Sequence, residues 1–172
     1  MLTHFQQRGL SLLELMATLA ILVVLATAAI PSFSSLVEQT RQKTAAESLR
    51  THLALARIES ITRQQWVTLC RSQDQQTCMG DNLTGAVEWP SVIMFVDYDK
   101  KRLPAKTEDI ISVLTFKSAI TVYWNRGDNI TYQPDGSVTG FSNGTFRINA
   151  GNLDKEHRLI LSLSGRVREE SY

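Results

Sequence analysis

The chain has 172 residues, with 18 Lys and Arg against 17 Asp and Glu, and a formal net charge of +1 at pH 7. This balance excludes a protein that binds nucleic acid over its whole surface, so any basic site must be local. The length is sufficient for one globular domain with its own core in addition to a long N-terminal helix.

An apolar segment dominates the N-terminus. It follows a short polar leader, residues 1–9, and it ends at Pro31. Its single charged side chain is that of Glu14. About 20 apolar residues are needed for a helix to cross a bilayer, so residues 10–31 are predicted to span a membrane. Arg8 on the short N-terminal side favours a cytoplasmic N-terminus.

The charge of Glu14 demands an explanation, because a charge at bilayer depth costs roughly 2.5–3.5 kcal/mol even on a mild insertion scale. Cleavage after Gly9 would create a partner, the free ammonium group of Leu10. A glutamate that caps its own helix N-terminus is the simpler alternative. The segment has two other interpretations: a plain membrane anchor, or a secretory signal peptide cut near Ala26-Thr27-Ala28, although its apolar run is longer than the usual 7–15 residues.

The stretch Gly9-Leu10-Ser11-Leu12-Leu13-Glu14 resembles the processing signature of the type IV pilin superfamily. In that superfamily a prepilin peptidase cuts after the glycine and methylates the new amine. The resemblance therefore implies Gly9 and Leu10 as the processing site. It also implies that Glu14 sets the register of assembly by meeting the Leu10 amine of a neighbouring subunit.

Helical character continues beyond Pro31, where a kink or a local loosening is expected. Residues 32–63 contain no Gly or Pro and are rich in good helix formers. Small and apolar side chains recur there at i, i+3 and i+4 spacing: Ala46, Leu49, Leu53, Ala56 and Ser60. The pattern predicts an amphipathic helix that packs one face on a domain.

Residues 64–172 are expected to form a β-rich domain, because the sequence pattern changes to short strands after Arg63. The predicted strands are 66–70, 92–96, 110–116 and 119–124, followed by hairpins 138–141/145–148 around Asn143-Gly144 and 158–163/166–168 around Ser164-Gly165. The predicted fold class is α+β and pilin-like: a long N-terminal helix packed on a mostly antiparallel, meander-like sheet.

The two cysteines, Cys70 and Cys78, enclose a short polar loop. Outside the cytoplasm such a pair is typical of a disulfide, which the chain-entropy model values at roughly 2.5 kcal/mol. A zinc site would need further ligands, and His4, His52 and His157 are scattered along the chain. We therefore expect a disulfide and no metal site.

Three stretches narrow the resemblance. They are the Cys-Arg-Ser stretch from Cys70 to Cys78, Phe95-Val96-Asp97, and Ser164-Gly165-Arg166-Val167-Arg168. In this order they resemble the GspH/FimT/FimU family of minor pilins and pseudopilins. In FimT-type pilins a G-R-x-R motif is linked to DNA binding during natural transformation. The resemblance implies a weak, sequence-independent contact with double-stranded DNA through Gly165, Arg166 and Arg168.

The two arginines are predicted to lie on one face of a strand, because one residue separates them. Glu169 and Glu170 follow directly, and a solvated strand end in which these acids pair with Arg166 and Arg168 is the alternative to a DNA contact.

The sequence contains no G-x-S-x-G, Walker or Rossmann signature, so we expect neither an enzyme nor a cofactor. The expected partners are other pilins or pseudopilins, prepilin peptidase, the inner membrane and double-stranded DNA. The expected location is the bacterial inner membrane and then a periplasmic or extracellular pilus fibre. The alternatives are an H-type minor pseudopilin of a type II secretion system and a structural pilus tip or initiation subunit that does not bind DNA.

Overall fold

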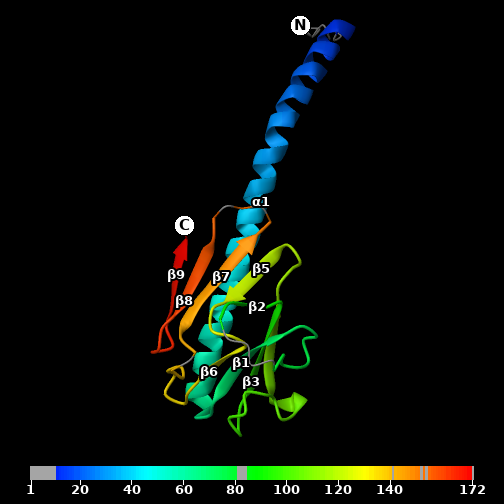
Figure 1. The fold of residues 1–172 in the computed structure, drawn as a ribbon. Coiled ribbons are helices and arrows are strands. Elements are labelled where there is room, and N and C mark those ends of the chain that lie inside the picture. Colours follow the sequence, from blue (N-terminus) through cyan, green and yellow to red (C-terminus); the bar gives the residue numbers. More distant parts are fainter. Residues whose placement is uncertain (1–10, 81–84, 141, 152, 154, 172) are drawn as a thin grey trace, which may run out of the picture. The chain divides into compact units, whose positions relative to one another are not determined.

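One helix, α1, begins at Leu12 and ends at Arg63 (Figure 1). The chain divides into two compact units, Met1–Val37 and Glu38–Tyr172, and α1 contributes to both. The computed structural model describes residues 11–80, 85–140, 142–151, 153 and 155–171. The side chains of residues 28–32 and 171 lie outside this description.

In the second unit, α1 buries one face. The five side chains with the predicted helical spacing are at most 1% exposed: Ala46, Leu49, Leu53, Ala56 and Ser60. The four apolar members belong to the main hydrophobic core of the domain. The predicted packing face is therefore confirmed. The helix also continues through Pro31, which lies inside the single element Leu12–Arg63.

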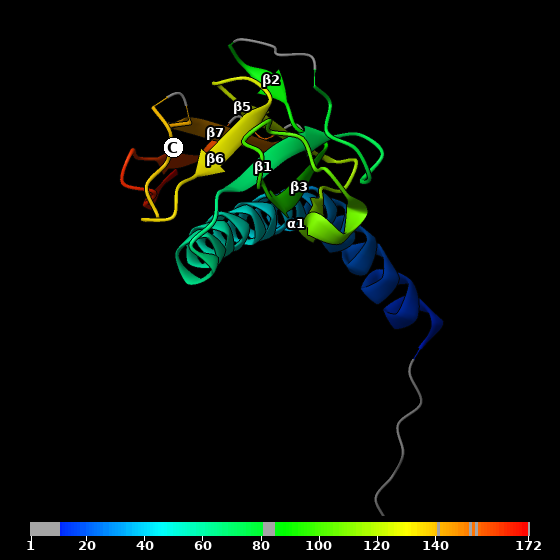
Figure 2. The same ribbon diagram turned by 90° about the horizontal axis from the view of Figure 1, so that it is seen from below.

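Two antiparallel sheets pack against this half of α1, as Figure 2 shows from the end of the domain. The strands of the first sheet lie in the order β4-β3-β1-β6. Their bounds are β1 Val67–Ser72, β3 Ser91–Val96, β4 Ile110–Thr115, preceded by the short 3-10 helix η1 Thr107–Asp109, and β6 Asn129–Tyr132. All their pairings are antiparallel.

The second sheet has the strand order β2-β5-β7-β8-β9 and carries the C-terminal hairpin. Its pairings are also antiparallel. The strands are β2 Val87–Glu88, β5 Ile120–Trp124, β7 Gly144–Ala150, β8 His157–Leu161 and β9 Val167–Ser171. In β5 and β8 buried and partly buried side chains alternate, so one face of this sheet packs on the core and the other faces outward.

Strands β1 and β3 are buried along their whole length, because both faces of the first sheet are covered. The face toward α1 joins the main core. On the opposite face a second apolar cluster forms from Cys70, Ile93 and Phe95, with Cys78 and Ile110 packed against it. This double coverage explains the continuous apolar run at residues 92–96.

The α+β, pilin-like fold class is confirmed, with two sheets in place of one meander. The predicted hairpin around Asn143-Gly144 is wrong. Strand β7 begins at Gly144 and pairs with β5 and β8, while Val138 forms only an isolated bridge with Tyr132. A Cβ atom at position 144 would overlap the side chain of Asn125, so close packing, and not turn geometry, accounts for this glycine.

Candidate functional site

The described chain begins with a helix cap. The hydroxyl of Ser11 accepts a hydrogen bond from the backbone N–H of Glu14 at 3.2 Å, and its carbonyl accepts from Leu15 N at 3.1 Å. The Ser11-x-x-Glu14 spacing is that of a capping box, a local signal that the sequence itself carries. Gly9 and Leu10, the predicted processing site, lie outside the described residues.

Glu14 stands at the start of an exposed apolar surface. Leu12, Leu13, Leu22 and Leu25 are each more than 60% exposed in the described chain. Within the described residues, no helix has a stretch long and apolar enough to be counted as a membrane span. The polar side chain of Thr18 does not interrupt the surface, because its hydroxyl donates to the Leu15 carbonyl at 2.9 Å.

The predicted disulfide between Cys70 and Cys78 is present, with the two Cα atoms 5.6 Å apart. Asp74 stabilises the loop that the disulfide closes. Its carboxylate accepts hydrogen bonds from the backbone N–H groups of Gln76 and Thr77 and from the Thr77 hydroxyl at 2.7–2.9 Å. These bonds, above all those from Thr77, hold the pKa of Asp74 well below its usual range.

The C-terminal hairpin joins β8 to β9 through a tight turn at Gly165. The turn is closed by hydrogen bonds from Gly165 N to Ser162 O at 2.9 Å and from Ser162 N to Arg166 O at 3.0 Å. Gly165 has φ +73°, and a Cβ atom there would overlap the carbonyl oxygen of Gly136. The turn therefore needs glycine for its conformation and for its close packing on the neighbouring turn.

The strand alternation sorts the charges of β9 onto two faces. Val167 and Glu169 face α1: Val167 packs against the core, and Glu169 lies 3.9 Å from the Arg50 guanidinium on the helix. Glu169 Oε1 is also 2.7 Å from His157 Nε2, outside hydrogen-bond geometry. Arg166 and Arg168 lie on the outward face, as predicted, and both are exposed.

The alternative to a DNA contact was that Arg166 and Arg168 pair with Glu169 and Glu170. The structure shows one such ion pair, between Arg168 and Glu170. Arg168 Nη2 lies 3.1 Å from Glu170 Oε1, and the Arg168 side chain is 72% exposed. Glu169 is turned away to the helix. Among the described residues, no hydrogen-bond or ion-pair partner is found for the Arg166 guanidinium. The outward face of the hairpin thus keeps an uncompensated positive charge.

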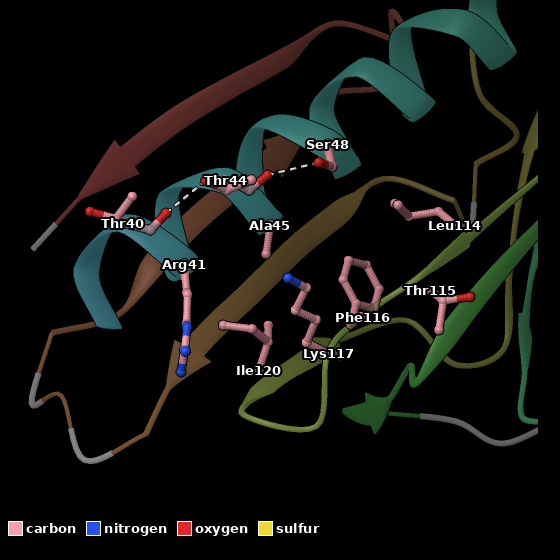
Figure 3. Close-up of a pocket in the computed structure, with 10 residues that line it drawn as sticks. All are labelled: Thr40, Arg41, Thr44, Ala45, Ser48, Leu114, Thr115, Phe116, Lys117 and Ile120. Atoms are coloured by element: carbon pink, nitrogen blue, oxygen red, sulfur yellow. Dashed lines mark hydrogen bonds between the residues drawn. The ribbon is translucent and has the colours of Figure 1, made fainter. Parts of the chain in front are cut away.

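A cavity of about 240 Å³ lies between α1 and the segment from β4 to β5 (Figure 3). Its apolar side chains include Leu114, Phe116 and Ile120, and Arg41 and Lys117 supply its positive charge (Figure 3). No Asp, Glu, His or Cys is among its ten lining residues, so carboxylate, imidazole and thiolate metal ligands are absent from the lining. The described residues also contain no cluster of three or more potential metal ligands.

One buried acid lies apart from these sites. Asp97 is 1% exposed and accepts hydrogen bonds from the Thr68 hydroxyl at 2.9 Å and from Arg102 N at 3.1 Å, both on Oδ2. Its Oδ1 atom is buried and finds no hydrogen-bond partner among the described residues. Burial raises the pKa of this carboxyl group above its usual value.

Comparison with protein families gives two matches. The family described as "Type II transport protein GspH" matches residues 45–165, and the "Prokaryotic N-terminal methylation motif" matches residues 4–30. The first covers most of the β-rich domain and the packed half of α1, and the second covers the apolar segment with Glu14. No curated protein matched the chain.

Solved structures share the fold. The type IV minor pilin FimU of Pseudomonas aeruginosa superimposes with a TM-score of 0.59 at 19% identity, over 78% of this chain and 92% of FimU. The minor pseudopilin EpsH of the Vibrio cholerae type 2 secretion system gives a TM-score of 0.54 at 16% identity, over 76% of this chain and 97% of EpsH. The chain therefore belongs to the GspH family of the type IV pilin superfamily, whose members are minor pilins and pseudopilins.

Proposed function

We propose that this protein is a minor pilin of a type IV pilus that contacts double-stranded DNA through its C-terminal hairpin. Prepilin peptidase cuts it between Gly9 and Leu10 and methylates the new amine. Residues 10–31 then hold it in the inner membrane, with the leader on the cytoplasmic side, until it is extracted into a fibre outside that membrane.

Support for the assembly step comes from the first turns of α1. Leu12 and its apolar neighbours are exposed, which favours contacts with lipid or with other helices. Glu14 places one carboxylate among them, and such a group is stabilised in a water-free bundle only by a close positive charge. The amine of Leu10 in a neighbouring subunit has the required charge, and methylation preserves it.

The observation that carries the DNA contact is the sorting of charges on β9. Arg166 and Arg168 lie together on the outward face, whereas Glu169 is held on the opposite face by Arg50. Guanidinium groups on an exposed face suit phosphate oxygens, and two contacts give weak, salt-sensitive binding without sequence preference. The ion pair with Glu170 is surface-exposed and easily exchanged for a phosphate.

The test is DNA binding by the full chain in a neutral detergent, measured by fluorescence anisotropy of a labelled duplex at low salt. The double variant Arg166→Gln/Arg168→Gln is expected to lose binding while its circular dichroism and melting temperature stay unchanged. Arg41→Gln, which removes one exposed arginine from α1, is the control and should bind like the unmodified chain. A double variant that binds as well as this control would refute the proposed contact.

The alternative function is that of a type II secretion pseudopilin, whose cargo is folded protein. It is favoured by the description of the matching family model. Absence of DNA binding by the unmodified chain at low salt would support this alternative or a purely structural pilus subunit. Mass spectrometry of the native N-terminus tests the processing step in either case, and a chain that starts at methylated Leu10 is expected.

A further inference from the structure

A third arginine shares the outward face of the second sheet with the hairpin. Arg147 lies in β7, between the buried side chains of Phe146 and Ile148, and it is exposed. The alternation along β7 places it on the face away from α1. No sequence motif marked this residue, because its relation to the hairpin depends on the pairing of β7, β8 and β9.

The cross-strand neighbours of Arg147 leave its charge uncompensated. In the register of the sheet it stands opposite Tyr123 on β5 and Arg158 on β8. Two like charges in directly opposed positions are unfavourable in an isolated sheet. Arg158 is neutralised by Glu156, whose carboxylate accepts two hydrogen bonds at 2.9 and 3.0 Å. For the Arg147 side chain, no partner is found among the described residues.

We call the outward face of β7, β8 and β9, from Arg147 to Arg166, the strip. The acids on this face do not neutralise the positive charge at its two ends. Glu156 and Glu170 each hold an arginine, and Glu88 lies opposite Tyr123 on β2, two strands from Arg147. Arg147 and Arg166 are the residues of this strip for which the described chain provides no anion. A sheet face with exposed arginines at both ends, for which the described residues supply no anion, is suited to a ligand with repeated negative charges.

The spacing of the arginines follows from the register. Arg147 and Arg158 are opposed, and so are Arg158 and Glu170, which lies two residues beyond Arg168. With strands about 4.8 Å apart and about 3.4 Å per residue, the Cα atom of Arg147 lies about 12 Å from that of Arg168 and about 17 Å from that of Arg166. Measured along the duplex axis, at about 3.4 Å per phosphate of one strand, these distances correspond to about four to five phosphates.

We propose that Arg147 is a DNA-contacting residue, so that the duplex lies across β7, β8 and β9 and is not held by the hairpin alone. This inference rests on the proposed DNA contact and extends it to the face of the sheet. Arg147 and the hairpin arginines bind separate phosphates of one duplex. The footprint therefore contains at least one more phosphate contact than the G-R-x-R motif by itself provides.

The experiment compares Arg147→Gln, the double variant Arg166→Gln/Arg168→Gln and the control Arg41→Gln in the full chain in detergent. Binding of a short labelled duplex is measured between 50 and 200 mM salt, a range over which phosphate contacts strongly affect affinity. Arg147→Gln is expected to weaken binding about fivefold at the lowest salt and to reduce the slope of log affinity against log salt by about 0.9. Arg41→Gln should change neither.

The possible outcomes separate the two proposals. If Arg147→Gln behaves like Arg41→Gln while the double variant loses binding, the hairpin acts alone and the role of Arg147 is refuted. If Arg147→Gln weakens binding and the double variant does not, the sheet face binds DNA and the hairpin proposal is refuted. An unmodified chain that binds no duplex at low salt overturns both. Unchanged melting temperatures exclude a loss of fold as the cause of weaker binding.

Discussion

The two units of the chain differ in the exposure of their apolar side chains. In residues 12–27 the large apolar side chains are exposed around the helix, and Leu22 is 62% exposed. In residues 38–172 the helix has one buried face, and Leu53 is 0% exposed within a core shared with both sheets. Within the described residues, α1 thus has an exposed apolar surface in one unit and one buried apolar face in the other.

Each unit is therefore expected to draw its stabilisation from a different source. The second unit buries its apolar surface within its own chain, so substitutions in its core are expected to change its free energy of unfolding. In the first unit the described chain provides no cover for the apolar surface, so substitutions there are expected to change association with lipid or other subunits. Changes at Glu14 and at Leu53 compare the two units directly, and changes at the disulfide and at Asp97 examine the second unit by itself.

Glu14→Gln is expected to abolish incorporation of the subunit into fibres. The proposed ion pair with the Leu10 amine would be buried in the assembled bundle, and removing one member of a buried pair costs about 3–5 kcal/mol, more than a hundredfold in an equilibrium constant. The measurement is the amount of subunit in sheared fibres relative to the membrane fraction.

The matched control for this change is Ser11→Ala. Glutamine preserves the capping box but removes the charge of Glu14, whereas alanine at position 11 removes the cap and keeps the charge. We expect Ser11→Ala to fray the first turn by about 1 kcal/mol and to retain assembly. The reverse result would assign Glu14 to helix capping alone.

Leu53→Ala is expected to destabilise the domain by about 2–5 kcal/mol, because it leaves a cavity in a fully buried site. Leu22→Ala makes the same chemical change on an exposed surface and should leave domain stability within about 0.5 kcal/mol. Chemical unfolding followed by tryptophan fluorescence reports on the domain only, since Trp66, Trp89 and Trp124 all lie within it. Equal shifts for both variants would contradict the division.

Reduction of the Cys70–Cys78 disulfide is expected to lower the free energy of unfolding by about 2.5 kcal/mol, the chain-entropy value for so short a loop. The measurement is chemical unfolding with and without a thiol reductant. The double variant Cys70→Ser/Cys78→Ser is the control, because the reductant should not change its stability. A reductant effect that persists in this variant would show that the disulfide is not the source.

Asp97→Asn is expected to stabilise the domain at pH 7 and to lose this advantage in acid. Burial raises the pKa of Asp97 in the folded state, so the wild-type chain loses stability as the pH rises from the unfolded pKa near 3.9 through the higher folded value. Asparagine carries no charge and escapes this loss. The measurement is the difference in unfolding free energy between variant and wild type at pH 7 and at pH 4, and a difference that grows in acid would refute the assignment.

Some features could be predicted because their cause is local in the chain. The i, i+3, i+4 spacing from Ala46 to Ser60 predicted the buried face of α1, since helix geometry alone places these side chains together. The final hairpin was predicted from Ser164-Gly165, because the turn requires a positive φ that glycine adopts without strain. The pair Cys70 and Cys78 predicted a disulfide because few other arrangements suit two close cysteines outside the cytoplasm.

Other features could not be predicted, because they depend on which strands become neighbours. Asn143-Gly144 has the local signature of a hairpin, but Gly144 is needed for close packing against Asn125. The buried ion pair of Arg71 with Asp128, at 3.0 Å, joins residues 57 positions apart. The register of β7, β8 and β9 decides that Arg147 shares a face with the hairpin arginines.

Local patterns in the chain were enough to predict the long helix, its change from an apolar to an amphipathic surface, the superfamily resemblance and the residues of the C-terminal motif. Three further features depend on the arrangement of the strands in space: there are two sheets, Glu169 is turned to α1 while the arginines face outward, and a cavity lies beside Arg41. The physical reason is that helix periodicity, turn conformation and cleavage signals depend on residues close in the chain, whereas strand order and the partners of charged side chains depend on contacts between distant segments.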